Sequence, residues 1–220
     1  MHNILFSNKE LIILGEIKLA SPTEGKLGKP EDIEGRALAY EQAGVDIISV
    51  ITEHTRFSGD TSFVPRIQKV TSMPILQKDF VMDVKQIYES KSLGVDALLL
   101  IASIVDTPTL KKFTALCKKL EIEPVVEVND ENDLKKALST STSCIAINAR
   151  DLRTFKVDVD RACQIMEKIP DRYIKLGFSG IHTSVEVKKY RNAGAKGVLV
   201  GTALMKTENI DTFVQELRNP

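Results

Sequence analysis

The chain alternates between short apolar runs and amphipathic stretches, and this alternation continues over nearly its whole length. Runs rich in Val, Ile and Leu that alternate with helical stretches of about 10–14 residues are typical of βαβ units. Most of the runs are apolar throughout, as expected for strands of a parallel sheet that is buried on both faces. We predict eight strands, at Ile12–Lys18, Val45–Ile51, Pro74–Asp79, Val95–Ile101, Pro124–Val128, Cys144–Asn148, Ile174–Ser179 and Val198–Ala203.

A faint internal repeat supports this order of elements. Ala43-Gly44-Val45-Asp46, Leu93-Gly94-Val95-Asp96 and Ala193-Gly194-Ala195-Lys196 each lead from a helical stretch, through a glycine stop, into a predicted strand. Eight βα units in 220 residues predict the α/β class and a compact (β/α)8 or TIM barrel, with residues 1–220 as a single catalytic domain. A doubly wound open sheet is the alternative, but no GxGxxG follows the first strand.

Composition excludes several classes of protein. Thirty basic and thirty acidic side chains give a formal net charge of +0, which argues against binding to nucleic acid or to an anionic membrane surface. The three cysteines, Cys117, Cys144 and Cys163, form no CxxC pair, and His54 and His182 lack ligands at metal spacing. The first residues do not resemble a signal peptide. We therefore expect a cytoplasmic protein with reduced thiols and no metal site.

Ionisable and amide side chains stand at the ends of several predicted strands. Glu16 and Lys18 are two residues apart, so they share one face of the first strand. Lys78, Glu127 and Asn148 end the third, fifth and sixth strands. In a (β/α)8 barrel this end carries the active site. Each charge alone is compatible with a structural ion pair, but their desolvation together favours a functional site.

The predicted mouth of the barrel fits an anionic substrate. Lys18, Lys78 and Arg150 outnumber Glu16 and Glu127 there, which predicts a slightly positive site. The loops after the seventh and eighth strands, the usual phosphate site of this fold, contain Ser179-Gly180-Ile181 and Gly201-Thr202. Ordinary glycine turns are the alternative. The long segment Leu19–Lys29 is either a mobile lid or a solvated surface loop.

Seven segments, in order along the chain, resemble the indole-3-glycerol phosphate synthase family. They are Gly15-Glu16-Ile17-Lys18 with Ala20-Ser21-Pro22, Pro74-Ile75-Leu76-Gln77-Lys78-Asp79-Phe80, Leu99-Leu100-Ile101, Val126-Glu127-Val128, Ile147-Asn148-Ala149-Arg150-Asp151-Leu152, Ser179-Gly180-Ile181 and Val200-Gly201. The resemblance runs from about residue 11 to the last strand. The Lys-Asp-Phe segment and the Asn-x-Arg-Asp-Leu segment are the most specific.

The resemblance implies a carbon–carbon lyase (carboxy-lyase) of tryptophan biosynthesis that needs no cofactor and no metal. Its substrate is 1-(2-carboxyphenylamino)-1-deoxyribulose 5-phosphate, which undergoes ring closure, decarboxylation and dehydration to indole-3-glycerol phosphate. The catalytic residues that it implies are Lys78, Lys18, Glu127, Glu16 and Asn148, and which lysine acts in which step stays open. The implied binding residues are Arg150 for orientation, Ser21, Ser179, Gly180, Gly201 and Thr202 for phosphate, and Phe57, Phe80, Leu99 and Leu152 for the aromatic ring.

Two departures from the family pattern affect what we expect. The family usually has a helical extension before the first strand, whereas about eleven residues precede it here, so we expect thinner cover over the aromatic side of the site. The family usually has Glu directly before the serine of the Ser-Gly-Ile segment, and this chain has Phe178. Because the main acid–base residues remain, we expect an active synthase with reduced turnover.

Two other functions stay open. A phosphoribosylanthranilate isomerase on a related barrel usually needs a Cys/Asp pair, and no cysteine ends the first strand here. A barrel that only binds a phosphorylated metabolite is the non-catalytic alternative. The resemblance also leaves open a partner enzyme of the same pathway.

Overall fold

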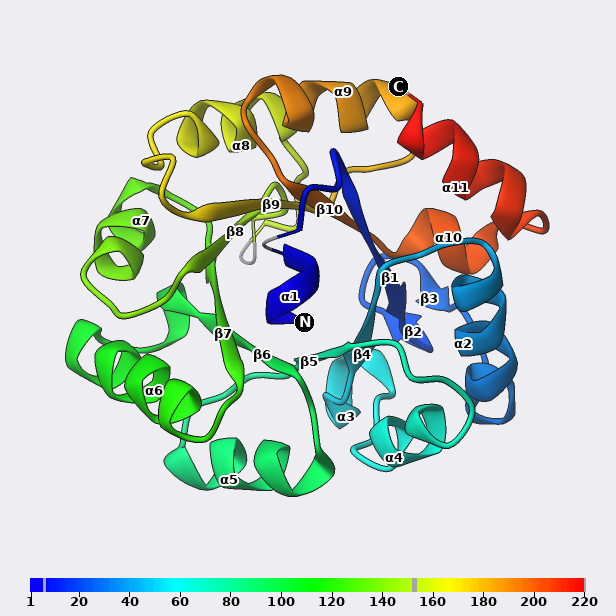
Figure 1. The fold of residues 1–220 in the computed structure, drawn as a ribbon, viewed down its shortest axis with the longest axis horizontal. Coiled ribbons are helices and arrows are strands. Elements are labelled where there is room, and N and C mark those ends of the chain that lie inside the picture. Colours follow the sequence, from blue (N-terminus) through cyan, green and yellow to red (C-terminus); the bar gives the residue numbers. More distant parts are fainter. Residues whose placement is uncertain (6, 152–153, 220) are drawn as a thin grey trace.

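A closed barrel of eight parallel strands forms the centre of the computed structural model, which describes residues 1–5, 7–151 and 154–219 (Figure 1). Around the barrel the hydrogen-bonded order is β1-β10-β9-β8-β7-β6-β5-β4. The strands are β1 (Ile12–Ile17), β4 (Ile47–Ile51), β5 (Ile75–Lys78), β6 (Ala97–Ile101), β7 (Glu123–Val128), β8 (Cys144–Asn148), β9 (Ile174–Phe178) and β10 (Gly197–Val200). This confirms the predicted (β/α)8 barrel and excludes the doubly wound open sheet.

Helices surround the barrel as an outer ring (Figure 1). They are α2 (Ile33–Gln42), α3 (His54–Phe57), α4 (Phe63–Gln68), α5 (Val84–Leu93), α6 (Thr107–Lys119), α7 (Glu131–Leu138), α8 (Val159–Met166), α9 (Ser184–Asn192), α10 (Thr202–Lys206) and α11 (Ile210–Arg218), with the 3-10 turns η1 (Pro30–Asp32) and η2 (Ala102–Ile104). No helix among the described residues is both long enough and apolar enough to cross a membrane.

Six predicted strands extend beyond the observed ones by one to three residues at an end, and two of these ends have a clear structural cause. The strand predicted to reach Ser179 ends at Phe178, because Ser179 adopts a left-handed conformation with φ of 69°. The strand predicted to reach Ala203 ends at Val200, and Ala203 belongs to α10. The segment Leu19–Lys29 is also more ordered than a plain loop, since β2 (Ala20–Ser21) and β3 (Gly25–Lys26) pair as an antiparallel hairpin.

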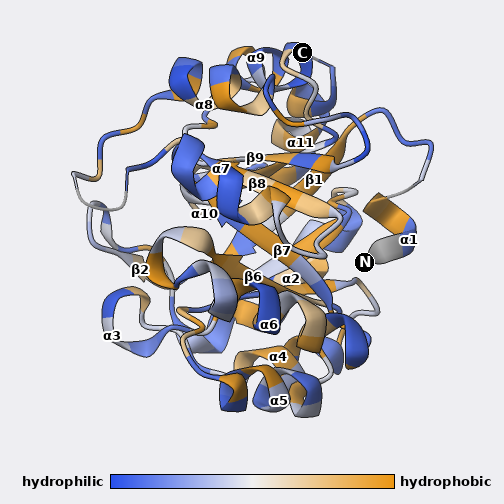
Figure 2. Ribbon diagram, turned by 90° about the vertical axis from the view of Figure 1, so that its left-hand side faces the viewer, coloured by the Kyte–Doolittle hydropathy of each residue, from blue (hydrophilic) through white to orange (hydrophobic). Residues whose placement is uncertain are grey.

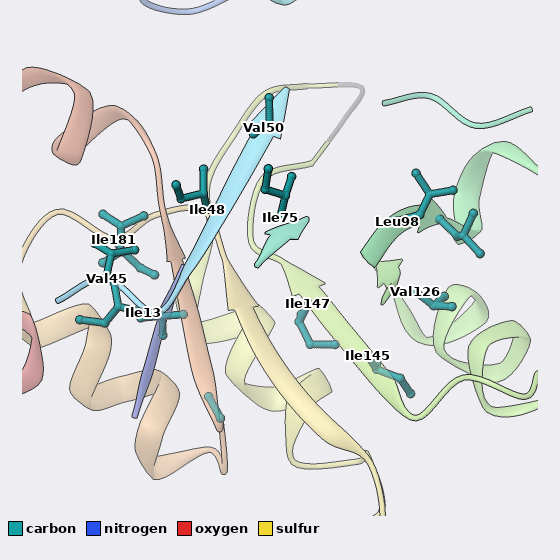
Figure 3. Packing of buried hydrophobic residues seen from close by; sticks show 14 of the residues in the cluster. Ile13, Val45, Ile48, Val50, Ile75, Leu98, Val126, Ile145, Ile147 and Ile181 are labelled. Atoms are coloured by element: carbon teal, nitrogen blue, oxygen red, sulfur yellow. The ribbon is translucent and has the colours of Figure 1, made fainter. Parts of the chain in front are cut away.

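Alternation along the strands divides the apolar side chains into two cores. Ile12 and Leu14 of β1, Leu76 of β5 and Leu99 of β6 belong to a cluster inside the barrel. Their neighbours in sequence point outward and pack beneath the helices. Figure 3 shows part of this outer cluster, including Ile13, Ile48, Val50, Ile75, Leu98, Val126, Ile145 and Ile147. Both faces are thus buried, which explains why the strand sequences are apolar throughout.

The repeated glycines end helices in the way that the sequence predicts. Gly44, Gly94 and Gly194 have φ values of 80°, 74° and 92°. Glycine adopts this conformation without the steric cost that a Cβ would add. Each turn directs the chain from the outer ring back into the next buried strand.

The N-terminal helix α1 (His2–Leu5) lies at the end of the barrel where the strands begin. Leu5 is fully buried in the inner cluster, and the terminal ammonium of Met1 lies 3.7 Å from Asp96, which directly precedes β6. In Figure 2, α1 is on the opposite side of the molecule from β2 and α3. The described residues before β1 therefore close the amino end of the barrel and give no cover to the carboxyl end.

We expect Leu5→Ala to lower the free energy of unfolding by about 2–4 kcal/mol, because it leaves a cavity inside the barrel. Urea unfolding measures this change. Leu38→Ala is the matched control, since Leu38 is 37% exposed and its removal should change stability by less than about 0.5 kcal/mol. Equal effects of the two substitutions would show that α1 does not contribute to the core.

Candidate active site

A pocket opens at the carboxyl ends of the strands, and both the barrel strands and the loops that follow them line it. It brings together all the described residues that the sequence nominates. Those that line it are Glu16, Lys18, Ser21, Phe57, Lys78, Phe80, Leu99, Glu127, Asn148, Arg150, Ser179, Gly180, Gly201 and Thr202. Leu152 is the remaining nominated residue and lies outside the described residues.

Glu16 sits between two lysines on the wall of this pocket. Its Oε1 lies 3.0 Å from Lys18 Nζ, and its Oε2 lies 2.9 Å from Lys78 Nζ. Burial alone would raise the pKa of Glu16, but the two ammonium groups outweigh it and lower that pKa to about 2. Burial disfavours the ammonium form of Lys78, yet Glu16 and Glu127 reverse this and raise its pKa. Glu16 is therefore ionised, and its charge favours the ammonium form of Lys78.

Glu127, on β7, lines the pocket four strands around the barrel from Glu16 and has a different environment. Asn148 donates a hydrogen bond from Nδ2 to Glu127 Oε1 at 3.0 Å. Glu127 Oε2 is buried and has no hydrogen-bond partner among the described residues. Burial raises the pKa of Glu127 in spite of the nearby Lys78 ammonium. The site thus holds one carboxyl group whose pKa is lowered and one whose pKa is raised.

We expect Glu127→Gln to raise stability at pH 7 while it lowers turnover. The folded pKa of Glu127 lies above its unfolded value, so ionisation of this carboxyl reduces stability as the pH rises between the two pKa values. Gln imitates the protonated form of Glu127 at every pH. The variant therefore gains free energy of unfolding over the parent near neutral pH, and this gain vanishes below about pH 4. Thermal unfolding of the parent and the variant at pH 7 and below about pH 4, together with kcat, checks this expectation. Destabilisation at pH 7 would contradict it.

The loops after β9 and β10 place backbone N–H groups and hydroxyls along one side of the pocket. Ser179 and Gly180 have consecutive positive φ values of 69° and 76°. A Cβ at Gly180 would lie 2.6 Å from the Val159 side chain, and one at Gly201 would collide with the Glu16 carboxylate. Both glycines are therefore required by close packing. This arrangement suits an anion such as a phosphate.

Apolar side chains form another wall of the pocket. Phe57, Phe80 and Leu99 line it, and the Arg56 guanidinium lies 5.7 Å from the centre of the Phe80 ring. Phe57 is held at the end of the short helix α3. Glu53 caps this helix by accepting hydrogen bonds from the backbone N–H groups of Thr55, Arg56 and Phe57. Such a wall suits a flat aromatic ring.

Several residues of the pocket were not predicted from the sequence. Glu53, Asp79, Phe155 and His182 all line it. With Glu53 and Asp79, four carboxyl groups face the three cations Lys18, Lys78 and Arg150, so the predicted positive balance is wrong. Both added carboxylates accept local backbone hydrogen bonds, and Asp79 also accepts one from the Thr52 hydroxyl at 2.6 Å. The available signal was their position, one residue after β5 for Asp79 and two residues after β4 for Glu53.

No group of three or more His, Cys, Asp and Glu side chains within residues 1–5, 7–151 and 154–219 could hold a metal ion. Among the cysteines, Cys144 begins β8 inside the barrel and is fully buried, and Cys117 is a buried residue of α6. Burial raises the thiol pKa of Cys117 to about 12. Neither of these two cysteines lines the pocket.

Comparison with solved structures supports the fold. The chain superimposes on 3-hexulose-6-phosphate synthase with a TM-score of 0.76, covering 95% of this chain and 99% of that one at 15% identity. It also superimposes on an N-acetylmannosamine-6-phosphate 2-epimerase from Clostridium perfringens, with a TM-score of 0.70, covering 91% and 90% of the two chains at 15% identity. At this identity the similarity concerns the fold alone.

Comparison of sequences identifies the family. The family model described as indole-3-glycerol phosphate synthase matches residues 1–217. Indole-3-glycerol phosphate synthase of Caldanaerobacter subterraneus subsp. tengcongensis is 42% identical over 95% of this chain and 82% of its own length. The protein of that name from Acetivibrio thermocellus is 36% identical over 99% of this chain and 84% of its own length. The chain therefore belongs to the indole-3-glycerol phosphate synthase family.

Proposed function

We propose that this pocket converts 1-(2-carboxyphenylamino)-1-deoxyribulose 5-phosphate into indole-3-glycerol phosphate, with loss of one carbon dioxide and one water. The observation that carries the proposal is the pairing of Lys78 with Glu16 at 2.9 Å in the pocket that also holds Glu127. A fixed ammonium and a second, protonatable carboxyl are the groups that an acid-catalysed ring closure and a dehydration need. Family membership supports the same reaction.

Lys78 is the proton donor for ring closure. When the carboxylate-bearing ring carbon attacks the ketone, the ketone oxygen gains negative charge and takes a proton from the ammonium. Glu16 keeps that ammonium charged and fixes its position, because burial alone would favour its neutral form. Release of carbon dioxide then restores the aromatic ring.

Lys18 and Glu127 are the acid–base pair for dehydration. The new hydroxyl must leave as water, and a proton must leave the neighbouring carbon so that the double bond of the indole can form. Glu127 is suited to proton exchange because its pKa is raised towards neutrality and its Oε2 is free of hydrogen bonds to described residues. Asn148 holds its other oxygen at 3.0 Å and orients the carboxyl group.

The remaining residues of the pocket bind the two ends of the substrate. The phosphate lies against Ser179, Gly180, Gly201 and Thr202. Ser21 of the β2–β3 hairpin follows β1, the neighbour of β10 in the barrel, and contributes from that side. Arg150 is the cation for the substrate carboxylate, and its Nη1 is held by the carbonyl of Phe155 at 3.1 Å. The aromatic ring lies between Phe57, Phe80 and Leu99, with Leu152 a further predicted contact.

The isomerase alternative lacks support at the site. It needs a cysteine at the end of the first strand, and β1 ends in Glu16 and Ile17. No observation in the pocket favours a barrel that only binds its ligand. Docking to another enzyme of the pathway and a cytoplasmic location stay predictions.

The test is product analysis by mass spectrometry after the protein is incubated with the substrate. A product lighter by one carbon dioxide and one water is the expected result. Phosphoribosylanthranilate, supplied in a second reaction, should remain unchanged. Recovery of unaltered carboxyphenylamino substrate, or isomerisation of phosphoribosylanthranilate, would overturn the proposal.

A further inference from the structure

Lys78 has a second neighbour that is not a charge. Its Nζ lies 5.2 Å from the centre of the Phe178 ring, on the face of that ring. The two residues come from β5 and β9, which lie four positions apart in the order of the eight strands and therefore face each other across the barrel (Figure 1). Phe178 is 1% exposed and does not line the pocket. The ring thus lies behind the ammonium and out of reach of a substrate.

The charges around Lys78 explain why an aromatic face is useful there. Glu16 is one carboxylate shared by two ammonium groups, at 3.0 Å and 2.9 Å. The two cations repel each other across this one carboxylate. The negative face of an aromatic ring attracts a cation within about 6 Å and carries no proton that could titrate. Phe178, on β9, therefore attracts the Lys78 ammonium from a different strand than Glu16, which is on β1.

The backbone of Phe178 holds the ring firmly in this place. Its carbonyl accepts hydrogen bonds from Ala149 N at 2.9 Å and from the Tyr190 hydroxyl at 3.1 Å. The preceding Gly177 lets Tyr190 approach closely, since a Cβ there would lie 2.5 Å from the Tyr190 ring. The ring itself packs in the inner core with its neighbours in register on β8 and β10.

We propose that Phe178 is a positioning residue that acts through Lys78. Together with Glu16, its ring holds the Lys78 ammonium at the position where ring closure needs a proton. This inference rests on the proposed function. It predicts that turnover depends on the electrostatic character of the ring as well as on its shape.

A graded series at position 178 separates these two properties. Phe178 is replaced by its 4-fluoro, 3,5-difluoro and 3,4,5-trifluoro derivatives and by cyclohexylalanine, introduced at this one codon. Successive fluorines weaken the negative ring face with little change of shape, and cyclohexylalanine removes it. We expect kcat to fall stepwise, by about three- to tenfold at the end of the series, with KM within about twofold of the parent. The same series at Phe113, buried in the outer core, controls for packing.

The outcomes of this series distinguish the inference from the function on which it rests. A parent that forms indole, with kcat unchanged along the fluorine series, would overturn the role of Phe178 and leave the synthase intact. A parent without turnover would overturn the proposed function. Phe178→Leu and Phe178→Glu extend the test: Glu attracts the cation and Leu does not, so Glu should retain the higher kcat. A folded Glu variant that is slower than the Leu variant would contradict the inference.

Discussion

Lys78→Ala is expected to lower kcat by about a thousandfold or more, because it removes the proton donor for ring closure. The barrel should stay folded. Glu16 keeps its 3.0 Å ion pair with Lys18, so no buried carboxylate loses all its partners. Initial rates of indole formation measure the change, and circular dichroism confirms that the variant has folded.

Two further variants show whether the effect belongs to proton transfer. Lys78→Arg keeps the charge but binds its proton too tightly to be an efficient acid, so it should also lose most of its turnover. Lys85→Ala, at an exposed position on α5, should behave as the parent. Substantial turnover in Lys78→Ala would show that Lys78 is not the acid and would move that role to Lys18.

Glu16→Gln is expected to destabilise the protein by about 2–4 kcal/mol at pH 7 and to abolish most turnover. The substitution leaves Lys18 and Lys78 side by side without their shared carboxylate. The folded pKa of Glu16 is about 2 against an ordinary value of 4.5. The ionised carboxylate therefore contributes stability that is fully present well above pH 4.5 and is lost as the pH falls towards 2.

Urea unfolding of the parent and the variant between pH 7 and pH 3 measures this contribution. The difference in the free energy of unfolding should be largest at pH 7, and more than half of it should be gone by about pH 3. Glu89→Gln, at an exposed position on α5, should show no such trend. A difference between Glu16→Gln and the parent that stays constant with pH would show that the Glu16 pKa is not lowered in the folded state.

Most of the barrel could be predicted from the sequence because its signals are local. Each strand is a short apolar run that both cores bury, and a glycine with positive φ such as Gly94 marks the preceding helix end. Alternation along a strand also predicted that Glu16 and Lys18 share one face, and both line the pocket. Resemblance to the family supplied the binding residues in the loops.

The rest depends on contacts that a single sequence does not display. Leu5 closes the amino end of the barrel because distant strands surround it, and nothing in its own segment indicates this. Phe155 faces the pocket because its backbone adopts a φ of 59°, which is uncommon for a bulky residue. Phe178 was visible only as a departure from the family pattern. Its contact with Lys78 arises from strand order across the closed barrel.

Indole formation by the unmodified protein tests the central claim most directly. The chain contains no tryptophan and only four tyrosines, so a product indole can be followed by fluorescence with little background. The protein is mixed with 1-(2-carboxyphenylamino)-1-deoxyribulose 5-phosphate, and Lys78→Ala is measured in parallel. We expect a continuous rise of indole emission in the parent and none in the variant. A flat trace from folded parent protein would contradict the assignment of this pocket as an indole-forming site.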